Sequence, residues 1–412
     1  MKTTFVSSVQ SHLRSAVFRL KRCVALLAVP CLLATVALYG QESYQEFLNR
    51  QKEGEQKEKE AFARYKESVT KEYEQFLERE RQAYREYVND IRQRWGKEKA
   101  KTSSKKEWVS YDGDFNARRS VDFEKGQASV EVLVEKDLPD QEVRKRVGSE
   151  ILKMIGDRGL ADPLEAKQKA PSPAPVLEGQ LETETTGPVT RENAEAYADE
   201  ILRTASVRRD PVVGADGSSR IAARVTFSLV PNHIRVRAER YSEMVVKNAS
   251  RFGVDAALVY AVIHTESCFN PRARSSAPAY GLMQLVPQSG ARAAYLFVHG
   301  EDKLLSPDHL YDASNNVELG SGYLSLLMTT SFKDVTDPLS RSYCAIAAYN
   351  TGAGNVASAF VGKRNIPEAI RRINAMTPEQ VFARMRSSLP YAETRGYIVN
   401  VSDRVKMYQE RR

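Results

Sequence analysis

The sequence predicts an α+β protein with a C-terminal domain dominated by helices, a smaller α+β domain before it, and a long amphipathic helix near the N-terminus. Three patterns predict this class. Residues 231–412 are apolar with helical spacing, residues 107–136 alternate with a period of two, and residues 41–105 are charged and contain no proline. A chain of 412 residues has room for two or three such domains.

The first forty residues are typical of an export signal. Basic residues, the last of them Arg22, precede an uncharged apolar run over residues 23–40. The site before Gln41 is poor for cleavage, because Leu38 stands two positions before Gly40. Residues 1–40 are therefore predicted to be a signal peptide or an uncleaved signal anchor. We expect an exported, periplasmic protein, with membrane attachment through this segment as an alternative.

Residues 41–105 are predicted to form one long helix. Its apolar side chains recur at helical steps along a single stripe, namely Phe62, Tyr65, Val69, Tyr73, Phe76, Tyr84, Tyr87, Ile91 and Trp95. The stripe fits a coiled-coil spacer or a partner helix, and it fits equally a helix lying against its own domain. Aromatic residues in place of leucines argue against a regular coiled coil. The sequence names no partner for this helix.

Residues 106–230 are predicted to form the small α+β domain. The alternating stretch SVDFEKGQASVEVLVE indicates a hairpin around EKGQ. Helices are expected over residues 140–159 and near 191–205, and a further strand at ARVTFSLV. Between them, residues 163–190 are rich in proline and are predicted to be a linker or a long loop. We find no chemical motif in this domain.

Charge and cysteine content narrow the chemistry. The net charge of +8 favours polyanionic partners, but no aromatic–basic platform supports nucleic acid. The chain has five histidines and neither a CxxC nor an HExxH motif, so no metal and no cofactor are expected. Cys268 and Cys344 lie outside the signal segment; they form either a disulfide or two buried small hydrophobic residues.

Glu266 is the strongest candidate for chemistry. It lies in FGVDAALVYAVIHTESCFNP, which is predicted to be a helix that Asp255 caps at its N-terminus. Val262 and Ile263 precede Glu266 by four and three residues, so the glutamate shares the buried face. Burial raises the pKa of a carboxyl group, which suits a general acid. A glutamate satisfied by a structural partner is the alternative interpretation.

Four separated motifs give this glutamate a context. ESCFNP, GLMQ, AYNTGAG and ETRGY follow one another in this order over residues 245–405. Together they resemble the soluble lytic transglycosylase family of lysozyme-like murein enzymes. The resemblance implies a lysozyme-like fold for the C-terminal domain, residues 231–412, and peptidoglycan glycan strands as its substrate.

The resemblance also implies roles for single residues. Glu266 occupies the position of the catalytic acid/base. Ser275, Gln284, Tyr349 and Asn350 match substrate-binding positions, and Tyr349 is expected to orient the carboxyl group of Glu266. Glu393, Tyr397 and Ser267 are expected to support the cleft.

One acid suffices in this family because the sugar's own 6-hydroxyl attacks C1, which leaves 1,6-anhydromuramyl ends. No second acid is predicted at a comparable position close to Glu266: Glu301 and Asp302 fall in a polar loop, and Asp308 and Asp312 are typical of turns or caps. Two alternatives remain, a goose-type hydrolytic lysozyme and a non-enzymatic protein that binds cell-wall glycan.

Overall fold

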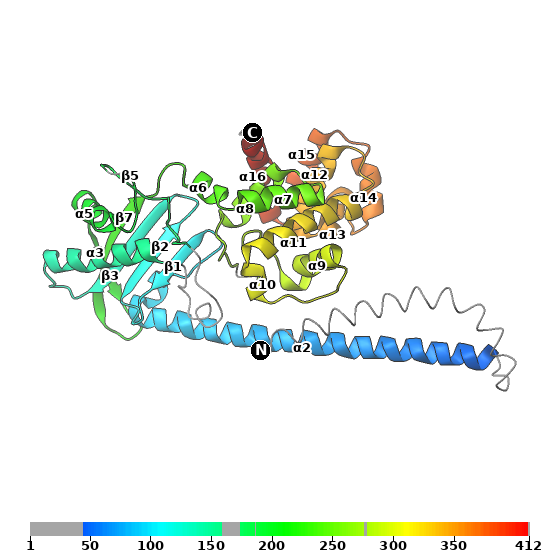
Figure 1. The fold of residues 1–412 in the computed structure, drawn as a ribbon, viewed down its shortest axis with the longest axis horizontal. Coiled ribbons are helices and arrows are strands. Elements are labelled where there is room, and N and C mark those ends of the chain that lie inside the picture. Colours follow the sequence, from blue (N-terminus) through cyan, green and yellow to red (C-terminus); the bar gives the residue numbers. More distant parts are fainter. Residues whose placement is uncertain (1–43, 159–173, 186, 276–277, 411–412) are drawn as a thin grey trace. The chain divides into compact units, whose positions relative to one another are not determined.

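The computed structural model describes residues 44–158, 174–185, 187–275 and 278–410 (Figure 1). The predicted signal segment and much of the predicted linker lie outside these residues. The chain forms two compact units, Met1–Leu77 and Glu78–Arg412. No helix within the described ranges combines the length and the apolar character needed to cross a membrane.

The described part of the first unit is helical. It is the beginning of α2 (Tyr44–Lys99), and its side chains are largely exposed. Gln56 donates to Glu60 one turn later at 2.8 Å, and Tyr73 stacks on Phe76 with ring centroids 6.2 Å apart. The side chains of Phe62, Tyr65 and Val69 lie outside the described part, so a coiled coil along this stripe stays a prediction.

The remainder of α2 lies against its own domain. Tyr87, Ile91 and Trp95, spaced by four residues, are buried against one face of a sheet. Trp95 also donates its indole N–H to the carbonyl oxygen of Phe115 at 2.8 Å. The helix ends at Lys99, earlier than the predicted residue 105, and its regular geometry is interrupted at Gly96. With φ 71° and the Val213 oxygen 2.4 Å from any added Cβ, Gly96 cannot carry a side chain without local rearrangement.

The sheet has five strands, all antiparallel, in the order β1-β2-β3-β7-β6. The predicted hairpin is present as β2 and β3, with Phe123 to Gly126 as its turn. The predicted strand at ARVTFSLV overlaps β7, which ends at Ser228 before the last two predicted residues, and two further strands complete the sheet. Their bounds are β1 Glu107–Tyr111, β2 Ala117–Asp122, β3 Gln127–Val134, β6 Arg208–Val213 and β7 Ser219–Ser228.

Alternation along β3 separates two cores. Val130 and Val132 belong to the core that also contains residues of α3 (Asp140–Gly156) and α5 (Ala194–Thr204), whereas Leu133 belongs to the core beside α2. Glu131, 2% exposed, pairs with Arg118 at 2.6 Å. Burying a charged acid costs free energy unless the acid is paired, and Arg118 supplies the partner of Glu131. The sequence pattern does not reveal this pair.

The predicted linker is partly a packed loop. Leu177 and Leu181 are each 2% exposed and join the core of the sheet domain. The short strands β4 (Glu182–Thr183) and β5 (Gly187–Pro188) pair with each other. The described part of this segment is thus held by its two leucines, which the proline content of the sequence obscures.

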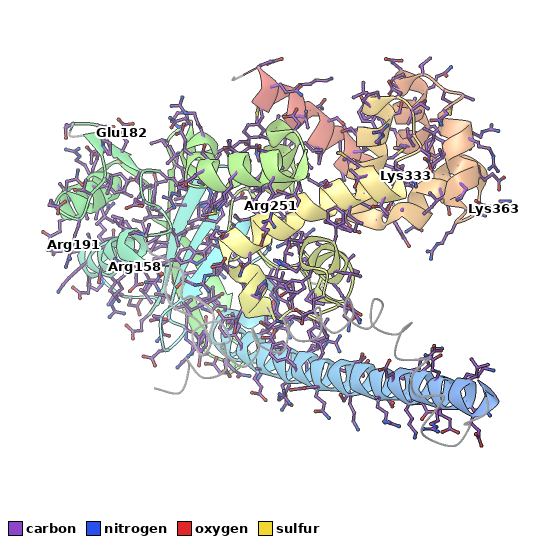
Figure 2. All side chains as sticks on the ribbon, turned by 45° about the vertical axis from the view of Figure 1, so that its right-hand side comes forward. Arg158, Glu182, Arg191, Arg251, Lys333 and Lys363 are labelled. Carbon is purple, nitrogen blue, oxygen red and sulfur yellow. The ribbon has the colours of Figure 1, made fainter. Side chains whose placement is uncertain are left out.

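The second half of the chain is a helical domain, which confirms the α+β class predicted for the whole (Figure 1). Arg251 on α7 pairs with Glu318 on α11, while charged residues such as Lys333 and Lys363 are exposed on its surface (Figure 2). The helices are α6 His233–Glu239, α7 Ser242–Phe252, α8 Ala256–Ser267, α9 Arg292–His299, α10 Pro307–Tyr311, α11 Ala313–Leu326, α12 Pro338–Thr351, α13 Ala353–Val361, α14 Ile366–Ile373, α15 Pro378–Ser388 and α16 Ala392–Gln409, with π-helical turns η1 Pro287–Ala291 and η2 Leu327–Ser331.

Helix α8 lies in the core of this domain. The side chain of Asp255 accepts from the N–H of Ala257, which confirms the predicted N-cap. Ten of its twelve residues are buried, and α16 packs along it. Cys268 and Cys344 are both buried and free, so the pair does not form a disulfide.

Arg237 on α6 fixes the C-terminal end of α8. Cys268 and Phe269 follow the helix with φ of 48° and 60°, and their carbonyl oxygens accept from the Arg237 guanidinium at 2.9 and 2.8 Å. The guanidinium also lies 3.6 Å from the ring centroid of Phe123, in the turn between β2 and β3. Burial lowers the pKa of Arg237 to about 10, so the group remains charged at neutral pH.

We expect Arg237→Met to destabilise the protein by about 3 kcal/mol, because two buried carbonyl groups lose their donor. Urea unfolding at pH 7 measures this change. Arg235→Met, which alters an exposed residue on the same helix, is the matched control and should change the midpoint little. Equal midpoints for both variants would contradict the role given to Arg237.

Candidate active site

Glu266 lies in the last turn of α8 and is 5% exposed, on the buried face that the sequence predicts. Burial is the main cause that raises the pKa of its carboxyl group above the usual value. The positive charge of Lys105 acts in the opposite direction, and the negative charge of Glu393 raises the pKa further. The group is therefore biased toward the protonated form that a general acid requires.

Lys105 is a site residue that sequence reasoning missed. Its Nζ lies 3.5 Å from Oε2 of Glu266 and 3.9 Å from Oε1 of Glu393. It stands between α2 and β1, within the segment predicted to end the long helix, and 161 residues separate it from Glu266. No local pattern in the sequence could indicate this contact.

Glu393, which is expected to support the cleft, is a second acid close to this site, although its exposed position is not comparable with that of Glu266. Glu393, in the first turn of α16, shares the Lys105 ammonium group with Glu266. Packing of α16 along α8 brings these two distant segments together. The two carboxyl groups differ in environment, because the side chain of Glu393 is 75% exposed and that of Glu266 is 6% exposed.

Two tyrosines approach Glu266 from different helices. The hydroxyl of Tyr349 on α12, expected to orient the carboxyl group, instead donates to the carbonyl oxygen of Met283 at 2.8 Å. Tyr397 on α16 lies beside Glu266, and its hydroxyl group lowers the pKa of Glu266. The buried hydroxyl oxygen of Tyr397 nevertheless has no partner at full hydrogen-bond geometry. Burial, followed by the charge of Glu266, raises the pKa of both hydroxyl groups, so both remain protonated donors.

Gln284, expected to bind substrate, is part of a tight loop. Its side-chain NH₂ group donates to the carbonyl oxygens of Ala273 and Gly281 at 2.8 and 3.0 Å. Both amide hydrogens are therefore engaged within the protein. Gly281 allows a close backbone approach in this loop, because its φ is 78° and an added Cβ would collide with the Leu310 oxygen.

Asn316 on α11, which the sequence did not single out, holds the same loop. Its Oδ1 accepts from the N–H of Met283 at 2.7 Å, and its Nδ2 donates to the carbonyl oxygen of Tyr280 at 2.9 Å. Asn316 is fully buried. It fixes the loop that carries Gln284.

Of the other predicted residues, two join parts of the backbone around the site and one lines a cavity. Ser267, fully buried, places its hydroxyl 2.7 Å from the carbonyl oxygen of Leu282 and so ties α8 to the loop. Asn350 accepts from the hydroxyl of Thr394 at 2.6 Å, which joins the end of α12 to the start of α16. Ser275 lines a cavity that Lys105 also lines.

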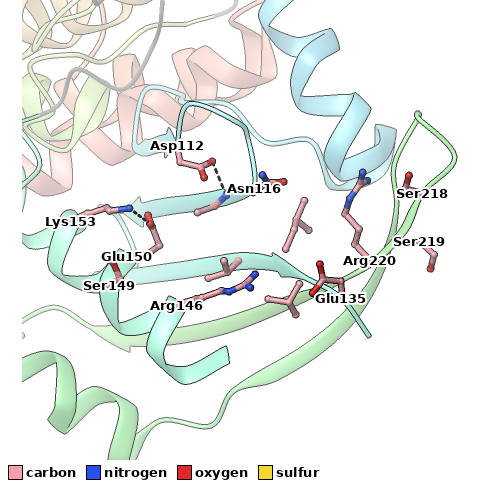
Figure 3. A pocket seen from close by; sticks show the side chains of 14 residues that line it. Asp112, Asn116, Glu135, Arg146, Ser149, Glu150, Lys153, Ser218, Ser219 and Arg220 are labelled. Atoms are coloured by element: carbon pink, nitrogen blue, oxygen red, sulfur yellow. Dashed lines mark hydrogen bonds and ion pairs between the residues drawn. The ribbon is translucent and has the colours of Figure 1, made fainter. Parts of the chain in front are cut away.

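This cavity has a volume of about 880 Å³, and Glu266 is not among its lining residues. Its lining is mainly cationic, with the basic residues Arg81, Arg85, Lys105, Lys106, Arg272 and Arg274 against the acidic residues Glu107, Asp122 and Glu124. A second cavity, in the sheet domain, has charges of both signs, and Glu150 and Lys153 pair within it at 2.6 Å (Figure 3). The first cavity shares Lys105 with the site, because Lys105 lines the cavity and also pairs with Glu266.

Comparison with known proteins gives this site its class. Residues 243–369 match the transglycosylase SLT domain, and residues 64–240 match the N-terminal domain of membrane-bound lytic murein transglycosylase C. The C-terminal domain, which carries Glu266, is thus a lytic transglycosylase domain.

Curated relatives extend over most of the chain. Membrane-bound lytic murein transglycosylase C of Sodalis glossinidius is 34% identical over 78% of this chain and 88% of its own length. The protein of the same name from Salmonella arizonae is 32% identical over 79% of this chain and 88% of its own length. The chain belongs to the family of membrane-bound lytic murein transglycosylase C, as the layout of a small α+β domain before a murein-degrading domain predicts. It is therefore an enzyme that acts on peptidoglycan.

Among solved structures, an inactive mutant of the lytic transglycosylase Slt from Pseudomonas aeruginosa aligns at 26% identity with a TM-score of 0.33. The alignment covers 42% of this chain and 24% of that one. The 70 kDa soluble lytic transglycosylase from Escherichia coli aligns at 23% identity with a TM-score of 0.31, covering 41% and 24% of the two chains.

We expect Glu266→Gln to raise the melting temperature at pH 7 but not at pH 4. The folded-state pKa of Glu266 lies above its unfolded value, so folding stability falls as pH rises from the unfolded pKa through the folded pKa. Glutamine carries no charge and escapes this fall. Calorimetry at both pH values measures the difference.

Glu243→Gln, at an exposed position on α7, is the control and should show the same small effect at both pH values. A variant at Glu266 that is less stable than wild type at pH 7 would contradict the expectation.

Proposed function

We propose that Glu266 is the single catalytic acid/base for cleavage of the β-1,4 bond between N-acetylmuramic acid and N-acetylglucosamine. Glu266 gives its proton to the glycosidic oxygen, and the bond from that oxygen to C1 breaks. The 6-hydroxyl of the muramyl residue then bonds to C1 and returns its proton to Glu266. The product is a 1,6-anhydromuramyl end, and no water is consumed.

The observation that carries this proposal is the buried carboxyl group at the end of α8, with a raised pKa and a hydroxyl group beside it. A carboxyl group that starts protonated can act first as acid and then as base. Tyr397 takes the orienting role expected of Tyr349. Ser275 is proposed to contact substrate, whereas Gln284 and Asn350 would support the cleft through the backbone and α16.

The charge of the neighbouring cavity also fits this substrate. Peptidoglycan carries carboxylates on its lactyl groups and stem peptides, and a cationic lining attracts them. Ser275 lies in that lining and in the segment that follows α8, close in sequence to Glu266. We therefore place the glycan strand along this cavity and past Lys105.

Glu266→Gln should reduce glycan release from purified peptidoglycan by about 1,000-fold or more, because the proton donor is lost. Binding to peptidoglycan should persist, since the substitution preserves the shape of the side chain. Release and pull-down assays measure the two effects, with Glu243→Gln as the control of unchanged activity. Undiminished release would refute the role of Glu266.

Product mass separates the proposed reaction from hydrolysis. Anhydro ends are one water lighter than reducing ends, so mass spectrometry of wild-type digests should show anhydro ends as the main product. Reducing ends as the main product would favour the goose-type hydrolytic alternative. Binding without any release by wild type would favour a non-enzymatic glycan-binding protein.

We infer that the protein is exported to the periplasm and attached to a membrane through residues 1–40. The names of the relatives and the apolar run after Arg22 support this inference. Replacing the arginines and lysines of residues 14–22 with glutamate should move the protein from the membrane fraction to the cytoplasm, because the positive charges that direct export are lost. Fractionation and immunoblotting measure this shift; an unchanged distribution would contradict it.

A further inference from the structure

The N-terminal domain supplies a cation to the acid of the C-terminal domain. Lys105 lies outside residues 243–369, which match the transglycosylase domain. Its ammonium group bridges the carboxyl groups of Glu266 and Glu393 at 3.5 and 3.9 Å. The side chain of Lys105 is 33% exposed. Lys105 also lines the cationic cavity, so it stands between that cavity and the buried acid.

The backbone on either side of Lys105 is fixed, so its position follows from the fold of the sheet domain. The N–H of Ser104 donates to the carbonyl oxygen of Glu107 at 2.8 Å. The carbonyl oxygen of Lys106 accepts from the N–H of Phe123 at 2.9 Å. Ser103 accepts from the N–H of Val109 at 2.9 Å. The segment is thus an extension of the sheet edge.

Charged or titratable groups approach Glu266 from three parts of the chain. Lys105 comes from the segment before β1, and Tyr349 comes from α12. Glu393 and Tyr397 come from α16, and so does Arg404, which donates to Thr265 beside the acid at 2.8 Å. Of these groups, Lys105 is the cation in direct contact with the Glu266 carboxyl group.

We propose that Lys105 is a positioning residue of the transglycosylase reaction, which holds the Glu266 carboxyl group and stabilises the carboxylate that forms when Glu266 gives up its proton. This inference rests on the proposed function of Glu266. Burial favours the protonated acid, whereas an adjacent ammonium group favours the carboxylate. The N-terminal domain thereby sets the pH range of the catalytic domain.

The proposal makes a two-part prediction for Lys105→Met. The high-pH limb of kcat/KM, which reports ionisation of Glu266 in the free enzyme, should move up by about one pH unit. At low pH, where Glu266 is protonated in both proteins, kcat/KM should fall about 10-fold because the developing carboxylate loses its counter-charge. The two profiles should therefore converge as pH rises.

Three further variants complete the set. Lys105→Arg retains the charge and should restore the wild-type limb. Glu393→Gln should move the limb down, because a neighbouring negative charge is removed. Lys101 lies in the same segment as Lys105 but pairs with Glu107. Lys101→Met is therefore the control and should leave the pH profile unchanged.

Rates of glycan release from short purified strands, measured across pH with the full chain, give these profiles. The proposal would be overturned if the high-pH limb of kcat/KM for Lys105→Met stayed at the wild-type pH, or if kcat/KM fell by the same factor at every pH. Either result would mean that Lys105 has a structural role alone. The thermal unfolding midpoints of Lys105→Met, measured with and without Glu266→Gln, report the coupling between Lys105 and Glu266 independently of activity. Product mass tests the proposed reaction separately, so either idea can fail without the other.

Discussion

The position of Glu266 depends on how α8 ends. The helix stops one residue after Glu266, and the next two residues are held in the left-handed region, which is strained for residues other than glycine. Their carbonyl oxygens point to the guanidinium of Arg237, whose flat face covers Phe123 of the sheet domain. A buried cation thus stabilises both the strained turn and the junction of the two domains. Without it, two buried carbonyl groups after α8 would lose their donor.

Lys105 reaches the same junction from the other side. The hydrogen bond between Phe123 and Lys106 joins the segment that carries Lys105 to the turn that Arg237 covers. One turn of the sheet therefore serves two cations with different tasks. Arg237 satisfies the backbone after α8, and Lys105 faces the carboxyl group on α8. The small domain therefore contributes a charged group to the surroundings of Glu266.

Local sequence patterns predicted the features that depend on contacts between residues close together in the chain. The cap at Asp255, the buried face that contains Glu266 and the hairpin around EKGQ follow from short spacings, and all are present. The contact of Lys105 with Glu266 spans 161 residues, and no periodicity encodes it. The position of Tyr397 beside Glu266 depends on the packing of α16 along α8, and the position of Tyr349 depends on the packing of α12 against α16. Long-range packing, and not residue type, decided these cases.

The presence of Glu393 changes the reason why one acid can suffice. The sequence offered no second acid at a comparable position and assigned Glu393 to the support of the cleft, and in the structure Glu393 shares a lysine with Glu266. In the proposed reaction the two groups differ because Glu266 is buried and biased toward the protonated form, while Glu393 is exposed and already paired with Lys105. A carboxylate engaged by an ammonium group is poorly placed to activate water. The muramyl 6-hydroxyl, held on the same sugar, then reaches C1 with the advantage of an intramolecular nucleophile.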